Sequence, residues 1–230
     1  MAGVLRALLS ASEKAANIAR VCRQEGALFQ LLIQEKTGAD KNKKFTQDFK
    51  TLADVIIQEV VRHDVGKQFP ELLHAIHGEE SNTFENRLGG RVEVQVCSVE
   101  TDTAALLCSV LDGNEEAAGL LAQTIHQEIE LRDPAAERLE LAIPTSSMGI
   151  WIDPIDSTNQ YIKGRGDVDP EKGLYPSGLQ SALVLIGVYD RASGEPIMGV
   201  INQPFNQCDP GSLRYSGTPS PTNCTVCSEH

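Results

Sequence analysis

Apolar residues recur every three or four positions in the first part of the chain, which is the spacing of one helix face. This pattern predicts helical structure over residues 3–35, with Ser10 and Ser12 marking a break and a new helix start. The polar, lysine-rich stretch 37–50 predicts a loop or a short ribbon. Further helices are predicted at 48–63, 103–111, 115–131 and 157–163.

Short apolar runs bounded by turn residues predict the strands. Residues 72–76 lie between Pro70 and Gly78 and suit a buried strand, and residues 148–152 suit a second one. Both runs end next to acidic residues. Further strands are predicted at 92–96, 178–189 and 196–203, the last two as a hairpin. The mixture of helices and strands indicates an α+β fold.

The composition allows a folded core and limits the partners. With 230 residues and 41% hydrophobic content, the chain can bury one sizeable core or two small ones. A formal net charge of −12 argues against non-specific binding to nucleic acids and to anionic membranes. No apolar run approaches the roughly 18 residues of a membrane span, and no secretory signal is visible. We therefore expect a cytoplasmic protein in which Cys22, Cys97 and Cys108 are buried free thiols.

The character of the sequence changes after Phe205. Of the last 25 residues, 12 are Gly, Pro, Ser or Thr, and few are large and apolar. This composition is typical of disordered or extended chain. We therefore expect a folded domain over residues 1–205 and a disordered tail over residues 206–230.

The most informative stretch is Trp-Ile-Asp-Pro-Ile-Asp-Ser-Thr, residues 151–158. Asp153 and Asp156 lie three residues apart around Pro154, whose fixed φ should stiffen the turn. Two close carboxylates repel by about 4 kcal/mol at an effective dielectric near 20, so they favour a bound cation. Ser157 and Thr158 open a helix, where backbone N–H groups suit a phosphate. Simple capping by Asp156 or Ser157 is the alternative.

Other acidic residues precede this stretch. Glu79 and Glu80 follow the apolar run 72–76, and Asp54 lies in a helical pattern beside its apolar stripe. An isolated Glu-Glu pair is usually a solvent-facing turn, and an isolated Asp on a helix is usually a surface residue. Carboxylates are the ligands that Mg²⁺ prefers, so together the three blocks favour a magnesium site.

The order Asp54, then Gly-Glu-Glu at 78–80, then Asp-Pro-Ile-Asp-Ser-Thr resembles one superfamily. It comprises the lithium-sensitive, magnesium-dependent phosphomonoesterases related to inositol monophosphatase and fructose bisphosphatase. The resemblance covers residues 1 to about 205. It implies a layered helix-and-sheet sandwich of the sugar-phosphatase type, a Mg²⁺ cofactor, an inositol phosphate substrate and inhibition by Li⁺.

The resemblance also implies roles for individual residues. Glu79 is implied as a direct ligand of the first metal, and Glu80 as an outer ligand acting through water on an additional metal. Asp153 would bridge two metals, the Ile155 carbonyl would bind the first, and Asp156 the second. Thr158 and Asp54 are the implied catalytic pair that orients the attacking water, and Asp156, Ser157 and Thr158 are the implied substrate contacts.

Phosphate recruitment by an acidic protein requires local cations. Lys41, Lys43, Lys44 and Lys50 lie next to the Asp54 helix and are candidates. The alternative is a solvated basic loop.

One departure from the superfamily affects the expected activity. Members are longer and carry a third metal-binding aspartate on a Trp-Asp-x-x-Ala helix, whereas the only Trp here is Trp151. We therefore expect a C-terminally truncated form, and a non-catalytic chain that retains partial metal or phosphate binding is the alternative. A sister phosphatase acting on adenosine 3',5'-bisphosphate shares the three blocks and is a further alternative.

Overall fold

The computed structural model describes residues 2–24, 26–38, 41–44, 46–131, 144–208, 215–216 and 224–227. Helices and strands are mixed along the chain, which confirms the α+β prediction. Among these residues, no helix is long and apolar enough to cross a membrane.

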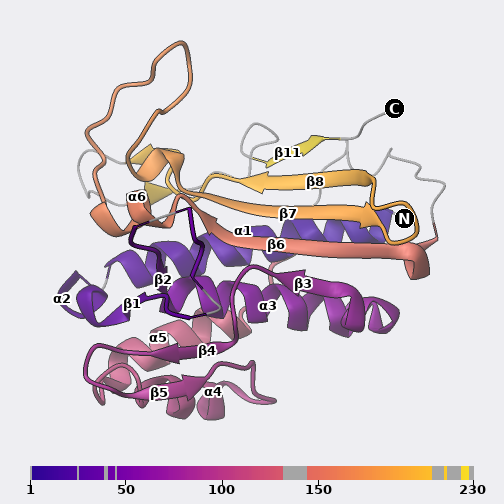
Figure 1. Ribbon diagram of the computed structural model, residues 1–230. Helices are drawn as coiled ribbons and strands as arrows, with labels where there is room; N and C mark the ends of the chain where they lie inside the picture. Colours follow the sequence, from indigo (N-terminus) through magenta and orange to yellow (C-terminus); the bar gives the residue numbers. More distant parts are fainter. Residues whose placement is uncertain are drawn as a thin grey trace.

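The largest sheet in the described part of the chain has five strands (Figure 1). The strand β3 is parallel to β6, and the other neighbours are antiparallel. Parallel neighbours end at the same edge of a sheet, so the residues after β3 meet the end of β6. In spatial order the strands are β11 (Cys224–Cys227), β8 (Pro196–Asn202), β7 (Leu183–Asp190), β6 (Met148–Asp156) and β3 (Ile76–Gly78).

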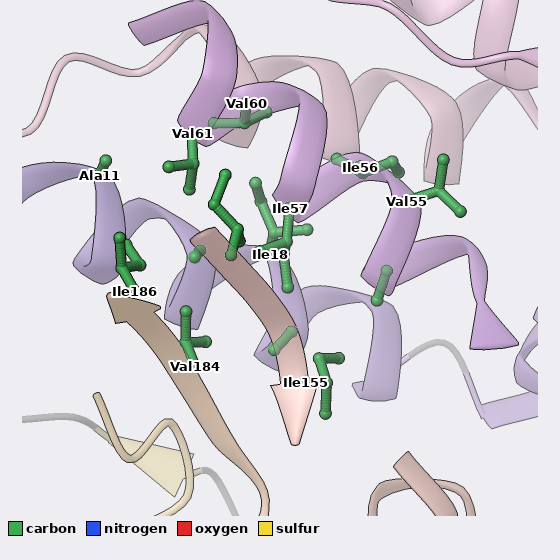
Figure 2. Packing of buried hydrophobic residues seen from close by; sticks show 14 of the residues in the cluster. Ala11, Ile18, Val55, Ile56, Ile57, Val60, Val61, Ile155, Val184 and Ile186 are labelled. Atoms are coloured by element: carbon green, nitrogen blue, oxygen red, sulfur yellow. The ribbon is translucent and has the colours of Figure 1, made fainter. Parts of the chain in front are cut away.

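Two long helices cover one face of this sheet (Figure 1). The helix α1 (Ala2–Gln24) packs against α3 (Leu52–Gln68); α1 contacts β7 and β8, and α3 contacts β3 and β6. Figure 2 shows apolar side chains of α1, α3, β6 and β7 gathered between the helices and the strands. Along β6, Ile150 and Ile152 are buried against the helices, while Trp151 is 51% exposed on the other face. Each fully buried Ile contributes roughly 1.5–3 kcal/mol.

A third group of elements lies beyond α1 and α3. The helices α4 (Glu100–Cys108) and α5 (Glu115–His126) pack together, and α5 contacts α1. The strands β4 (Thr83–Glu85) and β5 (Arg91–Glu93) form an antiparallel pair. The remaining elements are α2 (Gly26–Phe29), η1 (Gln30–Leu32), β1 (Ile33–Glu35), β2 (Phe49–Thr51), η2 (Pro70–Ala75), η4 (Thr145–Ser147), α6 (Thr158–Lys163), η5 (Leu179–Ser181), β9 (Gln207–Cys208) and β10 (Tyr215–Ser216).

The first helices differ from their predicted bounds. The predicted break at Ser10 and Ser12 is wrong, because the Ser12 hydroxyl donates to the Leu9 carbonyl inside α1 (2.8 Å) and starts no new helix. Residues 33–35 are a strand, β1, which pairs with β2, so the described residues of 37–50 belong to the predicted ribbon. The second helix starts at Leu52 rather than at 48, because β2 occupies the residues before it.

The predicted strand 72–76 is also wrong in position. Pro70 starts a 3-10 helix in which Leu72 and Ala75 are buried and Leu73 is 44% exposed. This spacing of three belongs to a 3-10 helix, and the strand begins only at Ile76. Three other elements differ from their predicted bounds. The helix α5 ends at His126 instead of 131, and β5 ends at Glu93 instead of 96. The strand predicted from 178 starts at Leu183, because η5 precedes β7.

The tail predicted as disordered over 206–230 is described only in part. Its described segments are extended and paired: β9 pairs with β10, and β11 pairs with β8. Without β11, β8 would be an edge strand with unpaired backbone groups, so even a polar segment gains hydrogen bonds by pairing with it. Residues 209–214, 217–223 and 228–230 lie outside the described residues.

Candidate active site

The C-terminal end of β6 carries an irregularity that positions two carboxylates. Asp153 pairs with Leu185 and Asp156 pairs with Leu183, so three steps on β6 oppose two on β7. Pro154 has no N–H to give to the ladder, so a bulge accommodates it where regular pairing would not. The bulge places both aspartates at one end of the sheet.

The parallel neighbour β3 brings a third carboxylate to the same edge. The chain leaves β3 at Gly78, and the Glu79 N–H donates to the Ile152 carbonyl (3.0 Å). Glu79 therefore follows β3 where Asp153 follows Ile152 on β6. This places together two blocks that are separated by more than 70 residues in sequence.

The start of α3 fixes Asp54. Thr51 is the N-cap, and Thr51 and Asp54 form a capping box. The backbone N–H and the hydroxyl of Thr51 both donate to Asp54 Oδ2, at 2.7 and 2.6 Å. Asp54 is 1% exposed, so the prediction that it lies beside the apolar stripe is correct and its carboxyl is buried in the protein.

A cleft of about 380 Å³ collects most of the predicted site residues. Its walls include Glu79, Asp153, Ile155 and Asp156, followed by Ser157, Thr158, Asn159 and Gln160 of the α6 start, and by Lys36, Gln47, Asp48 and Phe49 of the ribbon side. Asp54 and Glu80 do not line this cleft; they are buried residues, 1% and 8% exposed.

Burial and crowding raise the pKa values of Asp153, Asp54 and Glu80. Burial, followed by repulsion from Glu79, Asp156 and Glu80, raises the pKa of Asp153 to about 7. Burial, followed by repulsion from Glu80, raises the pKa of Asp54 to about 8, although hydrogen bonds from Thr51 oppose this. The carboxylates therefore lack sufficient compensating positive charge, as expected of groups arranged for a cation.

Lys36 is a site residue that sequence reasoning missed. Its ammonium forms ion pairs with Glu80, with Glu79 at 3.5 Å and with Asp48 at 4.0 Å, and its side chain is 4% exposed. Burial lowers the pKa of Lys36, but its contacts with these acids outweigh burial and raise it overall. The missed signal was its place at the end of the β1 strand, which the helical prediction over 3–35 concealed.

The predicted lysine cluster is not one unit. Lys50 is 2% exposed, and its ammonium donates to the Ser81 hydroxyl (2.8 Å) and to the Thr83 carbonyl (2.9 Å). Lys41 is on the surface and donates to the Thr46 carbonyl (2.8 Å). Lys50 therefore has a buried structural role next to the carboxylates, and it is neither a solvated loop residue nor exposed for recruiting phosphate.

The start of α6 differs from the capping alternative. Ser157 has φ 65°, a left-handed backbone, and neither it nor Asp156 caps the helix with its side chain. Capping side chains usually extend from a β-region backbone, which Ser157 does not have. The Thr158 hydroxyl donates to the Ile155 carbonyl (2.9 Å), whereas the Asp54 carboxylate accepts from Thr51. The two residues of the implied catalytic pair are therefore not hydrogen-bonded to each other.

The donor set is chemically suited to a hard divalent cation. Glu79, Asp153, Asp156 and Ile155 all line one cleft, and carboxylate and carbonyl oxygens are what Mg²⁺ binds. Among the described residues, however, no three His, Cys, Asp or Glu side chains are grouped closely enough to hold one ion. The Lys36 ammonium instead pairs with Glu79 and Glu80 on one side of the cleft.

Comparison with known proteins gives a family and several relatives. The model of the inositol monophosphatase family matches residues 4–218. Inositol polyphosphate 1-phosphatase of Mus musculus is 54% identical over 217 residues, 94% of this chain and 55% of that protein. The Homo sapiens protein of the same name is 53% identical, and 3'(2'),5'-bisphosphate nucleotidase 1 of Rattus norvegicus is 28% identical over 85% of this chain and 45% of that protein. The chain thus spans about half the length of the curated relatives it matches.

A solved structure is also similar. Extragenic suppressor protein suhB from Bartonella henselae superposes with a TM-score of 0.40 at 14% identity, covering 88% of this chain and 44% of that one. This likeness is too weak to argue from.

Proposed function

The chain belongs to the inositol monophosphatase family, and from this premise we propose that it is a Mg²⁺-dependent phosphomonoesterase acting on inositol phosphates. The observation that carries the proposal is the cleft where Glu79 after β3 meets Asp153 and Asp156 at the end of β6. These residues belong to the acidic blocks by which the sequence resembles the superfamily.

The finer proposal is removal of the 1-phosphate from inositol 1,4-bisphosphate and inositol 1,3,4-trisphosphate. Its support is 54% identity with a relative named inositol polyphosphate 1-phosphatase. We also propose inhibition by Li⁺ on the same resemblance, and a cytoplasmic site of action as expected from the sequence. The folded part that would carry this activity is residues 1–205.

The proposed Mg²⁺ would be held by Glu79, Asp153, Asp156 and the Ile155 carbonyl, with Glu80 as an outer ligand. Bound there, it would lower the pKa of a water and stabilise the charge that develops on the phosphate oxygens. The chain itself supplies the orienting groups. Asp54 is a buried carboxyl that accepts hydrogen bonds from Thr51, and it would hold a proton during the reaction. Residues 156–158 line the cleft and would offer backbone and hydroxyl groups to a phosphate.

Two alternatives each have a specific observation in their favour. A non-catalytic chain that retains partial metal or phosphate binding is favoured by the lack of three converging ligand side chains among the described residues. A bisphosphate nucleotidase is favoured by the 28% identity with the Rattus norvegicus nucleotidase, although the 54% identity with the phosphatase is much higher.

The test is phosphate release from inositol 1,4-bisphosphate by the purified chain with Mg²⁺, with and without Li⁺. We expect Mg²⁺-dependent, Li⁺-sensitive release that is lost in Asp153→Asn. Adenosine 3',5'-bisphosphate serves as the competing substrate, and faster turnover of it would favour the nucleotidase. No release by folded protein would support the non-catalytic chain.

A further inference from the structure

A side-chain amide beneath the cleft holds the backbone of Glu80. Gln58, on α3, is 1% exposed, and both ends of its amide are used on the same residue. Its Nε2 donates to the Glu80 carbonyl (2.5 Å), and the Glu80 N–H donates to its Oε1 (2.9 Å).

These two hydrogen bonds satisfy the backbone N–H and C=O of Glu80, as a neighbouring strand would. The strand β3 ends at Gly78, so Glu80 has no ladder partner in β6. The Glu79 N–H is held by the Ile152 carbonyl from the sheet, and the backbone of Glu80 is held by Gln58 from the helix. The turn that carries both glutamates is therefore fixed from two sides.

The Gln58 amide lies against the backbone of Gly78 and leaves no room there for a side chain. A Cβ added at Gly78 would lie 2.0 Å from Gln58 Oε1 and 2.4 Å from Gln58 Cδ, far inside contact distance. Gly78 lies in β3, directly before the turn. Glycine at 78 and glutamine at 58 are thus a matched pair, because a side chain at 78 would displace the amide from Glu80.

Gln58 and Asp54 lie on the same helix. The two residues are four apart on α3 and so lie on the same helix face. Like charges in this region repel, and a loosely held turn would let Glu79 and Glu80 move away from the other acids. Two hydrogen bonds from a rigid helix oppose that movement.

We infer that Gln58 is a positioning residue, whose amide holds the Glu79–Glu80 turn against α3 so that the two carboxylates stay near Asp54 and Asp153 for a divalent cation. This inference rests on the proposed metal site. It concerns a residue that contacts neither cation nor substrate and acts only through Glu80.

The experiment uses Mn²⁺, a paramagnetic substitute for Mg²⁺, and measures its dissociation constant by EPR. The variants are Gln58→Ala, Gly78→Ala and the double variant, with Gln68→Ala as the control at an exposed position of the same helix. Partners that orient metal ligands typically change metal affinity about 10- to 100-fold when removed, so we expect that loss for Gln58→Ala and none for Gln68→Ala. Gly78→Ala should weaken binding similarly, and the double variant should be no weaker than Gln58→Ala alone.

A second readout does not depend on metal. The Glu80 amide should exchange slowly with solvent in the wild type and quickly in Gln58→Ala, as followed by NMR. A wild type that binds Mn²⁺ and a Gln58→Ala variant with the same affinity would overturn the inference alone, as would a rapidly exchanging Glu80 amide in the wild type. A folded wild type that binds no Mn²⁺ would overturn the proposed metal site together with the inference.

Discussion

Replacing Asp153 by asparagine should stabilise the metal-free protein at pH 8 while removing a proposed metal ligand. Burial and the surrounding carboxylates raise the pKa of Asp153 from 3.8 to about 7. Between pH 3.8 and about pH 7, the Asp153 carboxyl is therefore protonated in the folded state and ionised in the unfolded chain. Stability falls as the pH rises through this window and is lowest, with respect to this group, above about pH 7.

The size of the effect follows from the same values. A rise from 3.8 to about 7 corresponds to about 4 kcal/mol, and screening by water at this half-buried side chain reduces it to roughly 2–4 kcal/mol. Asparagine has nearly the same shape and carries no charge to repel Glu79. For a chain of this length the gain corresponds to a rise in Tm of roughly 5–15 °C.

The assay is thermal unfolding followed by circular dichroism, in EDTA, at pH 4 and pH 8. Asp153→Asn should have a higher Tm than the wild type at pH 8, and the two should converge near pH 4. The exposed carboxylate Asp169 provides the matched control, because Asp169→Asn should leave the Tm unchanged at both values. An Asp153→Asn variant no more stable than the wild type at pH 8 would refute the reasoning that carboxylate crowding destabilises this site.

Three further substitutions test other contacts. Lys36→Met should destabilise the metal-free protein by roughly 3–5 kcal/mol in urea unfolding, because Glu80 loses its buried ion-pair partner. Added Mg²⁺ should restore part of the lost stability. A loss below about 1 kcal/mol would contradict this role of the ion pair. Thr51→Ala should cost about 1–2 kcal/mol in the same assay through loss of the α3 cap, and an unchanged urea midpoint would count against the capping box. Tyr161→Phe removes the hydroxyl that donates to the Ala19 carbonyl (2.9 Å) and should cost about 1–2 kcal/mol by calorimetry, whereas a neutral result would mean that water replaces this bond.

The sequence was most informative where the chemistry is local. Asp153 and Asp156 are three residues apart, and their place at the end of an apolar run was enough to predict a strand end that carries acids. Glu79 lies at the same edge of the sheet as Asp153, because Gly78 at the end of β3 pairs with Ile152 on the parallel strand β6. The metal-binding role of these residues stays a prediction. Neither apolar run indicates which strand it pairs with. The prediction that the two acidic blocks share one site therefore came from the family resemblance.

The residues that sequence reasoning missed act over long separations. Lys36 reaches Glu79 and Glu80 across more than 40 residues, and the amphipathic pattern around it was interpreted as helix. Gln58 looks like one more polar residue on a helix until the turn after β3 is placed against it. Hydrophobic periodicity reports which side of an element is buried, and it carries no information on which distant polar group that side meets.

The parallel pairing of β3 with β6 has a consequence for how the molecule tolerates change. The chain leaves the sheet at Gly78 and returns at Met148, and the excursion between them contains the β4–β5 pair, α4 and α5 (Figure 1). Glu79 and Asp153 are brought together by the ladder itself, whatever route the chain takes outside it. The exposed turns of the excursion, such as the one at Gly89, can therefore acquire insertions during evolution while the acidic edge remains as it is. Shortening it would instead remove core residues such as Phe84 and Leu121.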